Sequence, residues 1–191
     1  MTGAVFSLAD MESLTELVAT TWLKGSDRDW SVAAGTLEWS CTRTAAHAVD
    51  TVIAPAMFLA SRYVDHYPAG ELTFGDEPTP GQLVEGLRTA TNILAAVVTV
   101  AEPEVRAIIW LRPEPETRPP ADFVPRAGLE LILHAHDVCA GLGVPFEPPA
   151  DLCGRLREHT REWPMWKLWS ELPCTDDPWG DLLAASGRRR I

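Results

Sequence analysis

The chain has 191 residues, a formal net charge of −11, 46% hydrophobic residues and 23% charged residues. This length suits one globular domain with a small appendage, and the composition is ordinary for a soluble protein. The negative charge disfavours binding to nucleic acid or to an anionic membrane surface. The one basic run, residues 188–190, lies at the C-terminus, where we expect it to be exposed to solvent.

The first predicted helix begins after Ser7, a suitable N-cap, and repeats apolar residues at helical spacing as far as Trp22. A polar segment over residues 24–39 then predicts a long loop. A second helix is predicted over about residues 42–63. Pro55 lies inside it, and we expect this residue to kink or split the helix.

The third predicted helix has the clearest start in the chain. Thr79 and Gln82 form a capping-box pattern, with Pro80 at the first helical position. We expect this helix to end near Ala101. The short apolar run 108–111 fits either a strand or an extended loop, and the Pro-rich stretch after it predicts a connection.

The fourth helix is predicted over about residues 122–140, where Gly141 and Gly143 stop it, and one more amphipathic helix follows. Four long helices joined by long loops predict an all-α fold, a four-helix bundle with crossover connections. We assign residues 1–162 to this bundle and residues 163–191 to a Trp-rich tail packed on it.

The tail contains four of the eight tryptophans, namely Trp163, Trp166, Trp169 and Trp179. Such a cluster fits an aromatic lid over a substrate pocket, an anchor that holds the tail on the bundle, or a dimer interface. Packing is the commoner use of aromatic clusters, so we favour the last two interpretations. We expect a monomer or a homodimer.

Targeting signals are not apparent in the sequence. The N-terminal residues 1–14 lack the basic and apolar regions of a secretory signal. The longest apolar stretch, near residues 93–101, is shorter than the roughly 18 residues of a membrane span. The four cysteines show no CxxC spacing, so we expect free thiols in a cytoplasmic protein. They are Cys41, Cys139, Cys153 and Cys174.

Glu130 and His134 stand at i and i+4 of the fourth helix, so their side chains project from one face. A helix-stabilising pair would explain them alone, and a lone histidine on an apolar helix is usually a core residue. His47 lies on the second helix, and bundles build metal sites from carboxylates and histidines on facing helices. Two imidazoles and one carboxylate also form a known catalytic zinc set with an open fourth position.

Asp50 and Asp137 each follow one of these histidines by three residues. Carboxylates commonly orient metal-bound imidazoles, and we expect these two aspartates to do so. An ordinary polar position on a helix is the alternative interpretation for both.

Two segments resemble the DinB-like superfamily, in its actinobacterial, mycothiol-dependent maleylpyruvate isomerase branch. "WSCTRTAAHAVD" is similar to the family segment W-[ST]-x(6)-H, which matches Trp39 and His47. "ELILHAHD" is similar to the segment E-x-x-x-H-x-x-D, which matches Glu130, His134 and Asp137. The closing "DPWGDLLAASGR" also resembles endings in that group, and the likeness covers roughly residues 7–160 plus the tail.

The resemblance implies an up-down-down-up four-helix bundle and a divalent metal, usually zinc, bound by His47, Glu130 and His134. It also implies a low-molecular-weight thiol, such as mycothiol, as co-substrate. The family's isomerases carry a further C-terminal domain. Here only a short tail follows about Trp163, which disfavours maleylpyruvate isomerisation itself.

A thiol at the open position of such a metal would lose its proton, and the thiolate could attack a small electrophile. Together with this metal chemistry, the resemblance therefore implies a zinc-dependent thiol S-transferase or a thiol-dependent isomerase. A non-catalytic bundle that keeps the site for stability or for sensing a small ligand is the main alternative. A two-histidine, one-carboxylate iron oxygenase is a third, and the helical context argues against it.

Overall fold

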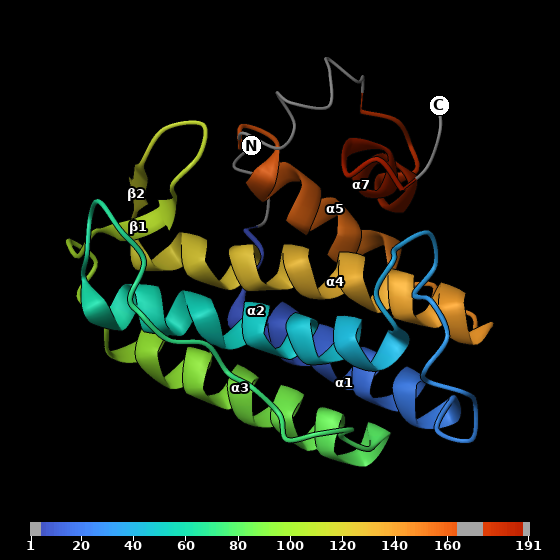
Figure 1. Cartoon of the computed structure of the whole chain (residues 1–191). Helices are drawn as coiled ribbons and strands as arrows, with labels where there is room; N and C mark the ends of the chain where they lie inside the picture. Colours follow the sequence, from blue (N-terminus) through green and yellow to red (C-terminus); the bar gives the residue numbers. More distant parts are fainter. Residues whose placement is uncertain (1–4, 164–173, 189–191) are drawn as a thin grey trace.

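The computed structural model describes residues 5–163 and 174–188, and the described chain is mostly helical (Figure 1). Its four long helices are α1 (Leu8–Lys24), α2 (Cys41–Ser61), α3 (Pro80–Val100) and α4 (Phe123–Leu142). The shorter elements are β1 (Ala107–Trp110), β2 (Glu116–Arg118), the 3-10 turn η1 (Pro120–Asp122), α5 (Ala150–Thr160) and α7 (Pro178–Ala185). The predicted all-α class is confirmed, with one small antiparallel hairpin added.

The long helices lie side by side, and α2 and α1 each pack against both α3 and α4. In Figure 1, α2 and α3 run in the same direction, because residues 62–79 return along them between the two helices. Helices α1 and α4 run the opposite way. Helices α5 and α7 pack on each other, on the side of α4 that faces away from α2 and α3.

Side-chain caps fix the starts of α1 and α3 where the sequence predicts them. The Ser7 hydroxyl accepts from the Asp10 backbone N–H at 3.2 Å, and the Asp10 carboxylate accepts from the Ser7 N–H at 2.9 Å. Thr79 and Gln82 make the same reciprocal pair, at 3.3 Å and 2.8 Å. Each box satisfies two N–H groups that a helix start would otherwise leave unpaired.

Helix α2 is continuous through Pro55, so the expected split is wrong. Proline removes the N–H that would bond the carbonyl of Thr51, four residues earlier. The Pro55 ring is buried in the core, and this burial offsets the loss of one hydrogen bond.

Two further elements differ from the sequence-based expectation. The Pro-rich connection contains β2, which pairs with β1 in an antiparallel register that places Arg118 opposite Ala107. The Ile108 N–H donates to the Tyr63 carbonyl at 2.7 Å, which fastens the hairpin to the end of α2. The tail contains α7, whose first turn is capped by the Asp177 side chain. Strand β2 depends on pairing with β1, and α7 packs against α5, so neither element follows from its own sequence alone.

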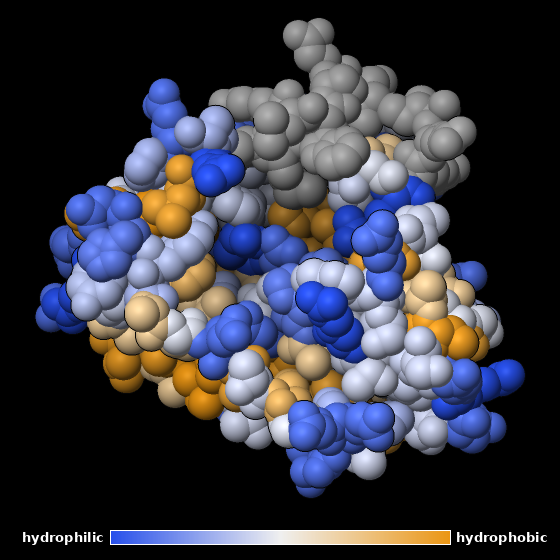
Figure 2. Space-filling view, viewed as in Figure 1, coloured by the Kyte–Doolittle hydropathy of each residue, from blue (hydrophilic) through white to orange (hydrophobic). Residues whose placement is uncertain are grey.

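Helices α2 and α3 are long and apolar enough, by length and composition, to cross a membrane. Core helices pass the same test, and these two lie against other helices here. Single polar residues interrupt the apolar runs of both helices, but the mean hydropathy over 18 residues stays high. Figure 2 shows hydrophobic residues on the visible face below α2, and the exposed Ile93 and Val100 belong to α3.

Candidate functional site

The contact between α2 and α4 positions the candidate residues, and small side chains make it close. Ala48 on α2 and Ala135 on α4 are fully buried. A Cβ atom on Gly141 would lie 2.4 Å from the Ala33 carbonyl oxygen and 2.6 Å from the Cys41 sulfur. These distances are shorter than van der Waals contact, so only glycine allows α4 to approach the start of α2 this closely.

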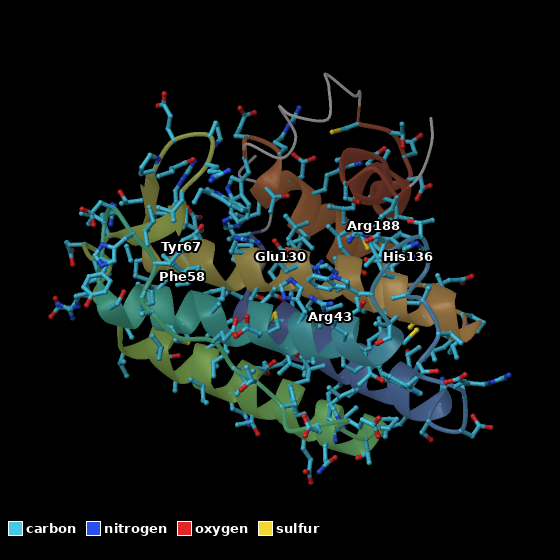
Figure 3. All side chains as sticks on the ribbon, viewed as in Figure 1. Arg43, Phe58, Tyr67, Glu130, His136 and Arg188 are labelled. Atoms are coloured by element: carbon cyan, nitrogen blue, oxygen red, sulfur yellow. The ribbon has the colours of Figure 1, made fainter. Side chains whose placement is uncertain are left out.

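His47 of α2 and His134 of α4 face each other across this contact. Their ring centroids are 5.0 Å apart, with an angle of 72° between the planes. The Glu130 Oε2 atom lies 3.5 Å from the Nε2 atom of His134. The structure thus brings together all three predicted metal ligands, from two helices that are far apart in sequence. Figure 3 shows Glu130 on α4.

Arg126 holds the other oxygen of the Glu130 carboxylate. The two side chains stand one helical turn apart on α4, and the ion pair joins Arg126 Nη1 to Glu130 Oε1. The guanidinium carbon of Arg126 also lies 3.9 Å from the ring centroid of Trp110, over its face. Sequence reasoning missed Arg126, although its i, i+4 spacing to Glu130 was available as a signal.

In the described part of the chain, no three His, Cys, Asp or Glu side chains are arranged as they stand to hold a metal ion. The donor set nevertheless suits a divalent ion, because two imidazoles and one carboxylate are a known zinc set. Glu130 uses Oε1 for Arg126, and Oε2 remains on the side of His134. His134 turns Nδ1 toward Asp137 and Nε2 toward Glu130, so Nε2 is the nitrogen that would bind the ion. His47, Glu130 and His134 are therefore the residues that would hold the ion.

Asp137 lies beside His134, as the sequence predicts. Its Oδ2 atom is 3.4 Å from His134 Nδ1, which is long for a hydrogen bond but close enough for a strong electrostatic contact. The same carboxylate binds Arg188 at 2.9 Å and 2.7 Å. The expectation that the C-terminal basic run is solvent-exposed is wrong for Arg188, whose side chain is only 18% exposed. Residues 189 and 190 lie outside the described residues.

Asp50, the other predicted orienting residue, makes its hydrogen bond to a different segment. Its Oδ1 atom accepts a hydrogen bond from the Leu72 backbone N–H at 2.7 Å. This bond fastens the segment that connects α2 to α3 against the side of α2. The Asp50 charge still acts on His47 through space and favours the protonated ring.

The charges around the site shift its titrating groups in different directions. Burial alone would raise the pKa of Glu130, but Arg126 and His134 outweigh it and hold that pKa far below its usual range. Burial would lower the pKa of His134, but Asp137 and Glu130 raise it above its ordinary value. Burial and then the charge of His134 lower the pKa of His47. One carboxylate therefore stays ionised while the two imidazoles differ in basicity.

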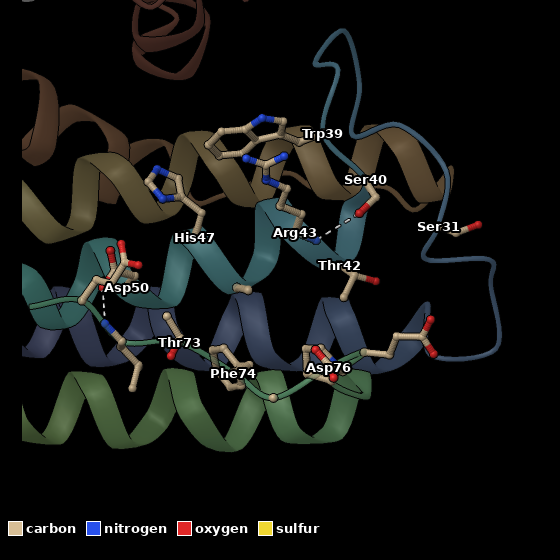
Figure 4. A pocket seen from close by; sticks show the side chains of 16 residues that line it. Ser31, Trp39, Ser40, Thr42, Arg43, His47, Asp50, Thr73, Phe74 and Asp76 are labelled. Atoms are coloured by element: carbon tan, nitrogen blue, oxygen red, sulfur yellow. Dashed lines mark hydrogen bonds between the residues drawn. The ribbon is translucent and has the colours of Figure 1, made fainter.

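A pocket of about 820 Å³ opens beside His47 (Figure 4). The long loop before α2, the first half of α2 and residues 71–78 form its walls. Trp39 packs edge-on against His47 with centroids 5.3 Å apart, and the Arg43 guanidinium carbon lies 4.2 Å from the Trp39 centroid. His47 therefore belongs both to the pocket wall and to the pair of facing imidazoles, which gives a small molecule access to the site.

No family model, characterised protein or solved structure matches this chain.

The cysteine thiols of the core are poor candidates for a nucleophile. Burial raises the pKa of Cys41 to about 11 and the pKa values of Cys139 and Cys153 to about 12. Each of these thiols therefore stays protonated near neutral pH. Cys174 is exposed on the segment that leads into α7.

Two of the four tail tryptophans are placed by the structure, and both pack. Trp163 is 2% exposed, with its ring centroid 5.8 Å from that of Trp110. Trp179 packs edge-on against His136 and Phe146, at 5.6 Å and 6.0 Å. These contacts favour anchoring over a lid for this pair. Trp166 and Trp169 lie outside the described residues.

Proposed function

We propose that the protein binds one divalent metal, zinc by preference, through His47, Glu130 and His134. We further propose that it activates a low-molecular-weight thiol, such as mycothiol, for S-transfer to a small electrophile or for isomerisation of one. The observation that carries this proposal is the 5.0 Å separation of the two imidazole rings, with Glu130 3.5 Å from His134. A core built only for stability has no need of two imidazoles and a carboxylate at one contact.

The fold that we propose is a DinB-like, up-down-down-up four-helix bundle with a short Trp-rich C-terminal extension. The parallel course of α2 and α3, with α1 and α4 opposed, supports it. The contacts of α7 with α5 support the packing of the extension. A cytoplasmic location and a monomer or homodimer belong to the same proposal.

Each side chain of the site has a distinct task. His47 and His134 donate ring nitrogens from two helices, so the geometry depends on the α2–α4 contact. Glu130 adds a negative charge, which Arg126 keeps ionised. Zinc held by two neutral imidazoles and one carboxylate carries a net charge of about +1, which favours a bound thiolate over a thiol. The pocket beside His47 gives the electrophile or the rest of the thiol a place to bind.

The attacking sulfur should come from a second substrate. The buried thiols of Cys41, Cys139 and Cys153 have raised pKa values and stay protonated. Cys174 is exposed. It precedes α7 in the sequence and belongs to neither of the helices, α2 and α4, that carry the proposed ligands. A Cys174→Ser variant is therefore the control for attack by a thiol of the protein itself.

The decisive assay measures conjugation of several low-molecular-weight thiols to a panel of electrophiles. Zinc-loaded wild type, chelator-treated wild type, His134→Ala and Cys174→Ser are compared at matched pH. We expect turnover in zinc-loaded wild type and in Cys174→Ser, and little in the other two. Equal rates in all four samples would remove the enzyme assignment, and the non-catalytic bundle that binds a metal or a small ligand would replace it.

A further inference from the structure

The turn after α7 points Arg188 at the site. Gly187 adopts a left-handed conformation with φ of 75°. Its N–H donates to the Ala184 carbonyl at 3.0 Å, and the Arg188 N–H donates to the Leu183 carbonyl at 2.8 Å. This pair of bonds is the Schellman motif that ends many helices. It turns the chain back over α4, where Figure 3 shows Arg188 near His136.

Arg188 binds both carboxylate oxygens of Asp137 through two nitrogens of its planar guanidinium group. Its Nε atom lies 2.9 Å from Asp137 Oδ1, and its Nη2 atom lies 2.7 Å from Oδ2. The side chains are 18% and 4% exposed, so solvent screens this pair weakly. Two parallel, charge-assisted bonds fix the plane of the carboxylate as well as its charge.

The carboxylate that Arg188 fixes is the one beside His134. Asp137 Oδ2 faces Nδ1 of the ring at 3.4 Å, while Nε2 faces Glu130 at 3.5 Å. A carboxylate on one ring nitrogen selects the tautomer and leaves the other nitrogen available to a ligand. The three side chains therefore form a chain of contacts from Arg188 through Asp137 to the face of His134 that looks toward Glu130.

We propose that Arg188 is a positioning residue of the site, which holds Asp137 so that Asp137 orients the His134 ring with Nε2 toward Glu130. The effect on metal affinity rests on the proposed function. The effect on the ring itself does not, because it concerns contacts among the side chains of this chain alone. The C-terminal segment then contributes a residue to the site in addition to packing on the helices.

The chain offers a matched control, because the same segment is held by a second buried Arg–Asp pair. Arg157 on α5 pairs with Asp181 on α7, with side chains 13% and 9% exposed. Asp181 also accepts from the Thr175 N–H at 2.8 Å. Removal of Arg157 loosens the attachment of the segment without touching Asp137 or His134.

The experiment compares wild type, Arg188→Gln, Arg188→Lys and Arg157→Gln in the full chain. Zinc affinity is measured by competition with a chromogenic chelator. We expect Arg188→Gln to weaken zinc binding about 10- to 100-fold, and Arg157→Gln to change it by less than about threefold. Arg188→Lys keeps the charge but loses the fork, so its affinity should fall between those of wild type and Arg188→Gln.

A second measurement follows the side-chain nitrogens of His134 by NMR in metal-free protein, at a pH where the ring is neutral. Both ring nitrogens face a carboxylate, so the measurement is comparative: wild type should hold more of the tautomer with the proton on Nδ1 than Arg188→Gln does. Equal behaviour of wild type and Arg188→Gln in both measurements would overturn the positioning role. So would an equal loss of affinity in Arg157→Gln. If wild type binds no zinc, the proposed function fails while the NMR comparison still decides the role of Arg188.

Discussion

Where α1 packs on α3, the buried polar side chains bond each other: the hydroxyls of Thr15 and Thr91 lie 2.8 Å apart. Where α2 packs on α4, the polar side chains are charged and only partly satisfied. His134 Nδ1 and Arg126 Nε are buried without a hydrogen-bond partner in the described residues. The same is true of Trp110 Nε1, on the ring beneath Arg126.

This difference between the two helix contacts bears on which of them is a candidate binding site. A buried polar atom without a partner costs on the order of 1–3 kcal/mol, so each of these three atoms opposes folding, as does Trp22 Nε1 on α1. The α1–α3 contact shows that the same fold can bury hydroxyls in a mutual bond. What distinguishes the α2–α4 cluster is its buried charge, and we propose that this cluster is kept for what it binds, whereas the α1–α3 contact serves stability.

The largest expected effect comes from removing a ligand on the α2–α4 side. His134→Ala should weaken zinc binding on the order of 10³-fold. The unfolding free energy of the metal-free protein should change by about 1 kcal/mol or less, because Glu130 and Asp137 keep Arg126 and Arg188 as partners. Calorimetric zinc titration and urea unfolding measure the two quantities. Tight binding by the variant would place the metal elsewhere.

A substitution in the core beside α1 should lower the unfolding free energy and leave zinc affinity unchanged. Leu14 is fully buried, and Leu14→Ala should lower the unfolding free energy by about 2–5 kcal/mol through lost burial and a cavity. Zinc affinity of the folded protein should match that of wild type, as measured below the onset of unfolding. A large loss of affinity would mean that the two contacts are not independent.

Gly141→Ala tests whether the close approach of α4 to α2 matters to both properties. The added methyl group meets a backbone carbonyl and the Cys41 sulfur, which have little room to move. We expect the unfolding free energy to fall by about 1–3 kcal/mol. Zinc affinity should fall as well, because the imidazoles sit on the two helices that are forced apart. Gly81→Ala, at an open position of α3, is the control.

The ion pair between Asp10 and Arg155, away from the site, should contribute stability that depends on pH. Burial opposes ionisation of Asp10, but Arg155 and Ser7 outweigh it, so its pKa lies below the ordinary 3.8. A lowered carboxyl pKa stabilises the fold above pH 3.8, and this stabilisation is lost as the pH falls through the folded-state value.

Asp10→Asn should therefore cost about 0.5 kcal/mol at neutral pH, a small value because solvent screens a partly exposed ion pair. Urea unfolding of both proteins over a pH series measures the difference, which should shrink toward zero in acid. A difference that grows as the pH falls below 3.8 would contradict the assignment.

The smallest effect is expected at the outer edge of the α1–α3 contact. Arg88 and Glu16 form an exposed ion pair at 2.7 Å. Exposed pairs contribute little, so Arg88→Ala should leave the Tm within about 1 °C of wild type. A thermal melt at low and high salt checks this. A larger, salt-sensitive drop would show that charge pairs outside the site also hold the helices together.

The sequence by itself determined the features that lie within one or two helical turns. The capping boxes at Ser7 and Thr79 depend on residues three positions apart, and both formed as predicted. The side-by-side placement of Glu130 and His134 follows from the helical repeat alone. Residues this close in sequence are brought together by the backbone hydrogen bonds of a helix, whatever the rest of the chain does.

The tertiary structure decided which of these local features became parts of a site. Asp50 and Asp137 stand at equal spacing from a histidine, yet one bonds Leu72 and the other reaches His134 and Arg188. Arg188 was expected in solvent, because no local pattern connects it with a residue 51 positions away. Such contacts form only when separate helices bury their apolar faces together, and the packing of those faces fixes which charges meet.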